Sequence, residues 1–277
     1  MAGTGGIWRR GAAFGGLGLA FAGSAAWSMQ RRLIYYPDAL PIPPAASVVS
    51  SAEDVQFTTD DGLTLRAWYV RPSSGAADRN VTVLMAHGNA GSRADRAPLA
   101  AKLARRGIAT LLLDYRGYGG NPGQPSEQGL ALDVRAAYWY LRKNRGVEPE
   151  RMIYFGESLG CGVVAELALR YPPGGVVLRS PFTDLVEVGK LHYPRLPVQF
   201  FLRDRFRVVD AVRKITVPIV VVYGTSDDIV PAEMSAKVAD AAKNLNSTVV
   251  LPGVGHNDPH MLVGGELISA VEGLIPD

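Results

Sequence analysis

Short apolar runs alternate with segments of helical character along most of the chain. Two runs at residues 54–59 and 63–70 flank the turn residues Asp60-Asp61-Gly62 and predict an antiparallel hairpin. Further strand-length apolar runs lie at residues 81–86, 110–113, 152–155, 175–178, 217–223 and 248–251. Helical segments are expected at residues 94–106, 126–144, 161–170 and 231–242. This alternation predicts an α/β fold with a mostly parallel, twisted sheet covered by helices on both faces.

The composition limits the size and the chemistry of this fold. With 277 residues, of which 47% are hydrophobic, the chain can form one large domain with a substantial core. The net charge of +3 comes from scattered side chains and does not indicate nucleic-acid binding. The single cysteine, Cys161, excludes an internal disulfide and a thiolate zinc site. No phosphate loop and no metal-ligand spacing occur, so we expect no cofactor and no metal.

An uncharged stretch at residues 11–30 lies between arginine pairs at residues 9–10 and 31–32. Twenty helical residues at about 1.5 Å each span roughly 30 Å, the thickness of a bilayer core. We expect a single-pass membrane anchor. The alternatives are a secretory signal cut near residues 20–22 or 24–26, which would give a secreted protein, and a peripheral surface helix. The flanking arginines do not decide the orientation in the membrane.

These features predict the domain organisation. Residues 1–31 form the anchor, or a signal peptide. Residues 32–51 form a proline-rich tether, because Pro37, Pro41, Pro43 and Pro44 disfavour a regular helix. Residues 52–277 form the α/β domain. Within it, residues 183–216 break the alternation of strands and helices. We expect them to form a short cap over the carboxyl ends of the strands, where ligands bind in such sheets. The alternative is a structural excursion that packs on the sheet.

The pentapeptide Gly156-Glu157-Ser158-Leu159-Gly160 separates an apolar run from a helical segment. A serine with glycine two places before and two places after it is typical of a nucleophile elbow, a sharp strand-to-helix turn. We expect the serine to have a positive φ, and both glycines to be required because neighbouring backbone passes close to them. The turn would present the hydroxyl of Ser158 at the carboxyl end of the sheet, above the start of the next helix.

A serine hydroxyl needs a general base to attack a carbonyl group, and a carboxylate to orient that base. The chain has four histidines, His87, His192, His256 and His260. In a sheet of this class the base follows the last strand. His256 lies in a glycine-rich loop directly after residues 248–251, whereas His260 lies a few residues farther along. We therefore predict His256 as the base for Ser158.

The acid should follow the strand at residues 217–223. Asp227 and Asp228 both lie in the next loop, and we predict Asp227 as the acid. Asp228 would then cap the following helix. Asp184, which follows the preceding strand, is a further candidate.

The oxyanion formed during attack needs fixed backbone N–H donors. One is predicted at Leu159, the residue after the nucleophile, and the other at Asn89 in the loop that follows residues 81–86, with Ala90 as the alternative. His87, in the same loop, is interpreted as a residue that braces the loop. Residues 114–119 are interpreted as mainly structural, and the carboxylate of Glu157 as solvated or locally bonded.

Several short motifs occur together in this chain. They are the elbow at residues 156–160, His87-Gly88-Asn89-Ala90-Gly91, Asp114-Tyr115-Arg116-Gly117-Tyr118-Gly119, Ser180-Pro181-Phe182, the Asp227 loop and Gly255-His256. With them the chain resembles the α/β-hydrolase superfamily over residues 30 to 277. Within it, the chain resembles the single-pass, membrane-anchored serine hydrolases of the alpha/beta-hydrolase-domain type, which include protein depalmitoylases and lysophospholipid lipases. The run at residues 32–37 belongs to this resemblance.

The resemblance implies Ser158 as nucleophile, Asp227 as acid, His256 as base, and the amides of Asn89 and Leu159 as the oxyanion hole. The chain departs from the family pattern in two ways. Gly120-Asn121 stands where relatives often carry a serine, and the cap is short, which leaves the specificity for a lipid chain open.

The expected activity is a two-step acyl transfer on a carboxylic ester or thioester. An acyl-enzyme forms at Ser158 and water then releases the acid. The substrate would be a small molecule or a lipid-linked acyl group, such as an acyl-protein or a lysolipid. The alternatives are an amidase or peptidase of the same fold, and a catalytically silent membrane-tethered binding module.

Overall fold

The computed structural model describes residues 31–38 and 41–276. They contain an eight-stranded sheet with the strand order β10-β9-β8-β7-β4-β6-β3-β2. Its strands are β2 (Ala52–Thr58), β3 (Thr64–Val70), β4 (Thr82–Ala86), β6 (Ala109–Leu113), β7 (Met152–Glu157), β8 (Gly175–Arg179), β9 (Ile219–Gly224) and β10 (Leu245–Leu251). The neighbouring strands from β10 through β9, β8, β7 and β4 to β6 all pair in parallel, whereas β3 pairs in the antiparallel sense with both β6 and β2. The predicted hairpin and mostly parallel sheet are confirmed.

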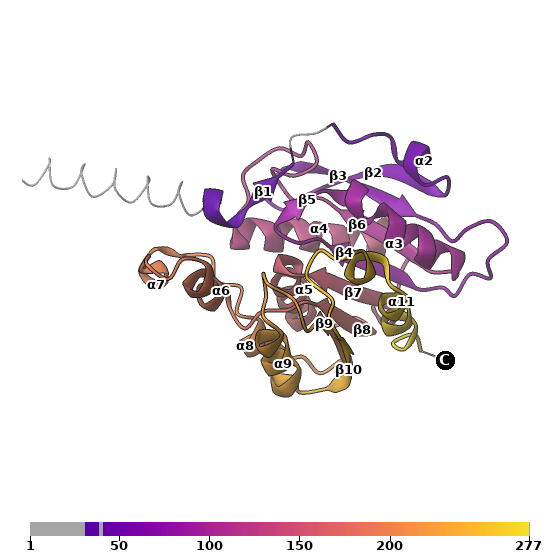
Figure 1. The fold of residues 1–277 in the computed structure, drawn as a ribbon. Helices are drawn as coiled ribbons and strands as arrows, with labels where there is room; N and C mark the ends of the chain where they lie inside the picture. The colour runs from indigo at the N-terminus through magenta and orange to yellow at the C-terminus, as the bar shows by residue number, and fades with distance from the viewer. Residues whose placement is uncertain (1–30, 39–40, 277) are drawn as a thin grey trace, which may run out of the picture.

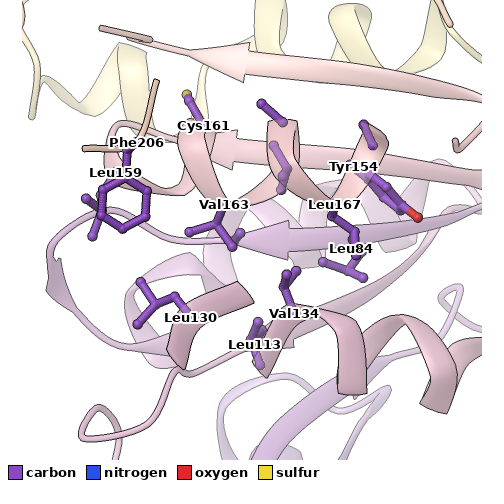
Figure 2. Packing of buried hydrophobic residues seen from close by; sticks show 14 of the residues in the cluster. Leu84, Leu113, Leu130, Val134, Tyr154, Leu159, Cys161, Val163, Leu167 and Phe206 are labelled. Atoms are coloured by element: carbon purple, nitrogen blue, oxygen red, sulfur yellow. The ribbon is translucent and has the colours of Figure 1, made fainter. Parts of the chain in front are cut away.

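Helices cover both faces of this sheet (Figure 1). One face packs against α4 (Glu127–Asn144), α5 (Leu159–Arg170), α8 (Val208–Val212) and α9 (Ala232–Ala241). The other packs against α3 (Arg93–Arg105) and α11 (Gly265–Glu272). Figure 2 shows the first of these cores, in which Leu130 and Val134 of α4 gather with Val163 and Leu167 of α5 around Leu84 of β4. The two-sided cover explains why the central strands are mostly apolar.

Side chains of the central strands alternate between the two cores. In β4, Leu84 belongs to the core under α4 and α5, whereas Val83 and Met85 belong to the core under α3. In β7, Tyr154 and Phe155 divide in the same way. This period of two follows from the strand geometry. Because the strand side chains fill these two cores, polar side chains can meet in the loops at the carboxyl ends of the strands.

The proline-rich segment is more ordered than the sequence predicts. Tyr36–Pro37 forms β1, which pairs with β5 (Ala90–Gly91), and Ala45–Val48 forms α2, a single helical turn. The expectation that the prolines exclude a regular helix here is wrong. Pro44 precedes the first helical residue, where its missing N–H is not needed. The carboxylate of Asp54 accepts a hydrogen bond from the N–H of Ala45 at 2.9 Å and holds the turn against β2.

Residues 183–216 contain three short helices, α6 (Leu185–His192), α7 (Val198–Phe201) and α8. The first two project beyond the sheet (Figure 1). Near the carboxyl terminus the structure adds α10 (Pro259–Val263) and α11, which the sequence analysis did not anticipate. The signals for α10 are present, because Pro259 occupies its first turn and Asp258 caps it.

The predicted anchor at residues 11–30 lies outside the described residues. Among the helices that residues 31–38 and 41–276 form, none has the length and apolar character needed to cross a membrane.

Candidate active site

The turn between β7 and α5 has the strained geometry that the pentapeptide predicts. Ser158 has φ 51° and ψ −113°. A Cβ atom at Gly156 would lie 2.7 Å from the Cα of Cys161, and one at Gly160 would lie 2.1 Å from the carbonyl oxygen of Ala86. Both glycines are therefore required by close backbone packing. The N–H of Ser158 donates to the carbonyl oxygen of Arg179 at 2.9 Å, which ties the turn to β8.

His256 and Asp227 meet after the last two strands of the sheet. Nδ1 of His256 lies 2.7 Å from Oδ2 of Asp227, and both residues are buried. The other carboxylate oxygen, Oδ1, accepts hydrogen bonds from the N–H groups of Ile229 at 3.0 Å and Val230 at 2.7 Å. Burial acts to raise the pKa of the Asp227 carboxyl, but the hydrogen bond and the charge of His256 outweigh it and lower the pKa below its ordinary value. The carboxylate thus stays ionised beside the imidazole.

The competing candidates lie in other surroundings. Asp228 is exposed. The expectation that it caps the following helix is wrong, because Pro231 is the residue that precedes α9. Asp184 caps α6 by accepting from the N–H groups of Val186 and Glu187. His260 is half exposed, and its Nε2 lies 2.9 Å from Oε2 of Glu266. His260 thus has a carboxylate partner as His256 does, but its pair with Glu266 lies at the surface, whereas the pair of His256 and Asp227 is buried.

The two predicted oxyanion donors line one cavity together with Ser158. This cavity has a volume of about 390 Å³, and Asn89 and Leu159 both belong to its wall. Leu159 is the first residue of α5, so its N–H has no partner within the helix. The Asn89 loop approaches Ser158 closely, since a Cβ atom at Gly88 would lie 3.5 Å from the Cβ of Ser158. The remaining wall is mostly apolar, with Phe182, Leu185, Val188, Val198, Leu202 and Val230.

His87 braces the same loop from inside the fold. It is buried, its Nδ1 lies 2.8 Å from the carbonyl oxygen of Gly88, and its ring contacts those of Tyr115 and Tyr118. Below it, the buried carboxylate of Asp114 pairs with Arg93 and accepts from the N–H of Arg93 at 2.7 Å. The structural interpretation of His87 and of the segment that begins at Asp114 agrees with these contacts.

A buried charge cluster beside the nucleophile was missed by the sequence analysis. Glu157 pairs with Arg96, and its Oε1 lies 3.0 Å from Nη1 of Arg179. Burial acts to raise the pKa of Glu157, but Arg179 and Arg96 lower it well below the ordinary value. Arg179 also donates to the backbone carbonyl of His256. Of the two expectations for Glu157, a solvated or a locally bonded carboxylate, the solvated one is wrong, because Arg96 and Arg179 enclose the carboxylate.

Cys161 is a buried thiol beneath the elbow. Its Sγ donates to the carbonyl oxygens of Gly156 and Arg179, each at 3.3 Å. Burial raises the pKa of the thiol well above its ordinary value. Across residues 31–38 and 41–276, no group of three or more His, Cys, Asp or Glu side chains could hold a metal ion.

The chain is similar to known proteins in sequence and in fold. A family model described as serine aminopeptidase, S33, matches residues 77–205. A Mycobacterium tuberculosis protein described as uncharacterised is 49% identical over 245 residues, which cover 88% of this chain and 86% of that protein. Alpha/beta hydrolase domain-containing protein 17C of Xenopus tropicalis is 30% identical over 211 residues, 76% of this chain and 66% of that protein.

The fold is similar to that of a solved esterase from Pyrococcus furiosus. The TM-score is 0.69 at 22% identity, over 86% of this chain and 97% of that one. The chain belongs to the α/β-hydrolase superfamily, as the strand order, the elbow between β7 and α5 and these similarities together show.

Proposed function

We propose that the protein is a serine hydrolase that cleaves a carboxylic ester or thioester through Ser158, His256 and Asp227. The observation that carries the proposal is the pairing of His256 with Asp227 at 2.7 Å, in loops joined to the elbow by Arg179. Arg179 accepts a hydrogen bond from the N–H of Ser158 and donates one to the carbonyl of His256. One residue thus supports both the proposed nucleophile and the proposed base.

In the first step, Oγ of Ser158 attacks the substrate carbonyl while Nε2 of His256 takes its proton. The carboxylate of Asp227 accepts from Nδ1–H, so it selects the tautomer with a free Nε2 and stabilises the imidazolium that forms. The imidazolium then protonates the leaving group, and the acyl group remains on Ser158. In the second step the same imidazole deprotonates a water molecule, which attacks the acyl-enzyme and releases the acid.

The negative charge on the tetrahedral intermediate would be stabilised by the N–H groups of Asn89 and Leu159. Each such donor is typically worth a factor of about 10² to 10³ in rate. Leu159 begins α5, so the positive end of the helix dipole lies below the same position.

The apolar cavity beside Ser158 supports an acyl substrate. Its volume of about 390 Å³ falls within the usual range for small-molecule sites, and the aliphatic wall suits a hydrocarbon chain. We further propose that residues 1–31 anchor the protein in a membrane and that the acyl group is drawn from a lipid or an acylated protein there. The uncharged residues 11–30 support this part of the proposal.

A fluorophosphonate probe tests the chemistry directly, because it reacts with an activated serine. The wild-type protein should be labelled covalently and should hydrolyse p-nitrophenyl esters, and Ser158→Ala should do neither. A folded wild-type protein that stays unlabelled, or a Ser158→Ala variant that labels equally well, would refute the proposal and favour a silent binding module.

A second candidate is cleavage of an amide bond, which the serine aminopeptidase description of the matching family model favours. The two activities can be separated with an ester and an anilide that carry the same acyl group. Ester hydrolysis should exceed anilide hydrolysis in kcat/KM. The reverse order would assign the protein to the amidases.

A further inference from the structure

The segment that follows the predicted anchor contacts the proposed oxyanion loop. The N–H of Tyr36 donates to the carbonyl oxygen of Asn89 at 2.8 Å, and Nδ2 of Asn89 donates to the carbonyl oxygen of Ile34 at 3.1 Å. The pairing continues in parallel register, with Tyr36 opposite Ala90 and Pro37 opposite Gly91. We call residues 33–37 the strap. Its hydrogen bonds fix the backbone carbonyl group and the side chain of Asn89, and so restrict the rotation of this residue.

The strap is also fixed to residues 183–216, between α7 and α8. Tyr35 is 4% exposed, and its hydroxyl donates to Oδ2 of Asp204 at 2.7 Å. Asp204 is itself buried and lies 169 residues away in sequence, after α7. Burial and the nearby Asp204 carboxylate raise the pKa of Tyr35, so its hydroxyl keeps the proton that it donates. The strap therefore joins the Asn89 loop to the segment between α7 and α8.

The opposite side of the strap faces the proposed substrate. Leu33, Ile34 and Tyr36 line the same cavity as Asn89 and Ser158. One short segment thus forms part of the cavity wall and holds the loop that carries a predicted oxyanion donor. A passive tether would not require either contact.

We infer that the strap is a positioning element of the active site, which holds the N–H of Asn89 where the oxyanion forms. This inference rests on the proposed serine hydrolase function. It predicts that the residues that link anchor and domain contribute to kcat without contributing a reacting group. Weakening the strap should harm binding of the transition state more than binding of the substrate, because only the transition state carries the full oxyanion charge.

The test compares Tyr36→Pro with Tyr36→Ala in the full-length protein. Proline removes the N–H that bonds to Asn89, whereas alanine keeps it and reports the loss of the side chain alone. The assays are hydrolysis of p-nitrophenyl butyrate and inhibition by butaneboronic acid, which forms a tetrahedral adduct with an active serine. Tyr36→Pro should have a kcat about 10- to 100-fold below that of Tyr36→Ala, with a similar KM. Its affinity for the boronic acid should fall by a similar factor.

Asn89→Ala provides a second test that leaves every backbone N–H in place. It removes only the bond to Ile34, so kcat and boronic acid affinity should both fall about 10-fold while the melting temperature stays near that of the wild type. This variant decides the question if Tyr36→Pro does not fold. Unchanged kcat and inhibitor affinity in Asn89→Ala, or equal kcat in the two Tyr36 variants, would overturn the inference.

The wild-type protein separates this inference from the function on which it rests. A wild type that neither labels with fluorophosphonate nor hydrolyses the ester would refute both. A wild type that does both, together with insensitive strap variants, would refute the positioning role alone.

Discussion

Nδ1 of His256 lies 2.7 Å from Oδ2 of Asp227, across 29 residues of sequence. The two oxygens of this carboxylate have separate tasks. Oδ2 contacts the imidazole, and Oδ1 accepts from the N–H groups of Ile229 and Val230 in its own loop. The loop thereby sets the direction in which the carboxylate faces His256.

Asp227→Asn should lower kcat for p-nitrophenyl butyrate by about 10³- to 10⁴-fold, because an amide cannot hold the imidazole in the required tautomer. Asp228→Asn is the matched control. Asp228 is exposed and adjacent in sequence, and this variant should stay within about twofold of the wild type. If the losses were reversed, Asp228 would be the acid.

Ser158→Gly should be more stable than Ser158→Ala by about 1 to 2 kcal/mol. Both variants lack the hydroxyl, but alanine keeps a Cβ atom at φ 51°, where glycine is tolerated far better. Urea unfolding of the two inactive variants measures the difference. Equal midpoints would mean that the turn does not store strain at this residue.

The buried Glu157 predicts how stability depends on pH. Its pKa in the folded protein lies below the ordinary value of 4.5, so its contribution is present above that pH and is lost as the pH falls. The free energy of unfolding of the wild type should therefore decline on acidification. Glu157→Gln should be less stable at pH 7 by about 3 kcal/mol and should show a flatter decline between about pH 5 and pH 3.

Glu187→Gln is the control for this measurement, because the side chain of Glu187 is exposed on α6 and pairs with the equally exposed Lys190. Its pH profile should match that of the wild type. A Glu157→Gln profile parallel to the wild-type profile would show that the Glu157 cluster does not contribute to acid sensitivity.

Arg179→Lys should lower kcat about 10-fold. Lysine keeps a positive charge near Glu157, but it lacks the planar fork with which arginine contacts both Glu157 and the carbonyl of His256. The loop of His256 would then be held less firmly, and small displacements at a catalytic site are costly. Arg179→Met, which also leaves Glu157 without this partner, should lose more stability than Arg179→Lys. An unchanged kcat in Arg179→Lys would show that Arg179 supports the fold only.

The elements were predictable from the sequence where one local signal decides them. Apolar runs identified the central strands, and the two glycines of the pentapeptide identified the turn at Ser158. The start of α4 also lies where the helical segment at residues 126–144 was expected to begin, and Ser126 caps it by accepting from the N–H of Gly129 at 3.1 Å. These features depend on a few neighbouring residues and on elementary sterics.

Features that depend on distant partners could not be predicted in this way. Nothing near Glu157 in sequence shows that Arg96 and Arg179 enclose it, and nothing near Tyr35 indicates Asp204. The strap belongs to residues 32–51, whose prolines predict an extended tether. The partner strand that orders it lies in the Asn89 loop, far away in sequence, and local signals do not indicate this pairing. Tertiary contacts of this kind override local preference.

The enclosed position of Cys161 has a practical use. It is the only cysteine of the chain, and the fold shields it from solvent. Maleimide dyes should therefore not react with the native protein. A cysteine introduced in place of Phe200, which is 80% exposed, would be the single site that such dyes label. A fluorophore there would test whether α7 moves during turnover, without any need to remove the natural thiol.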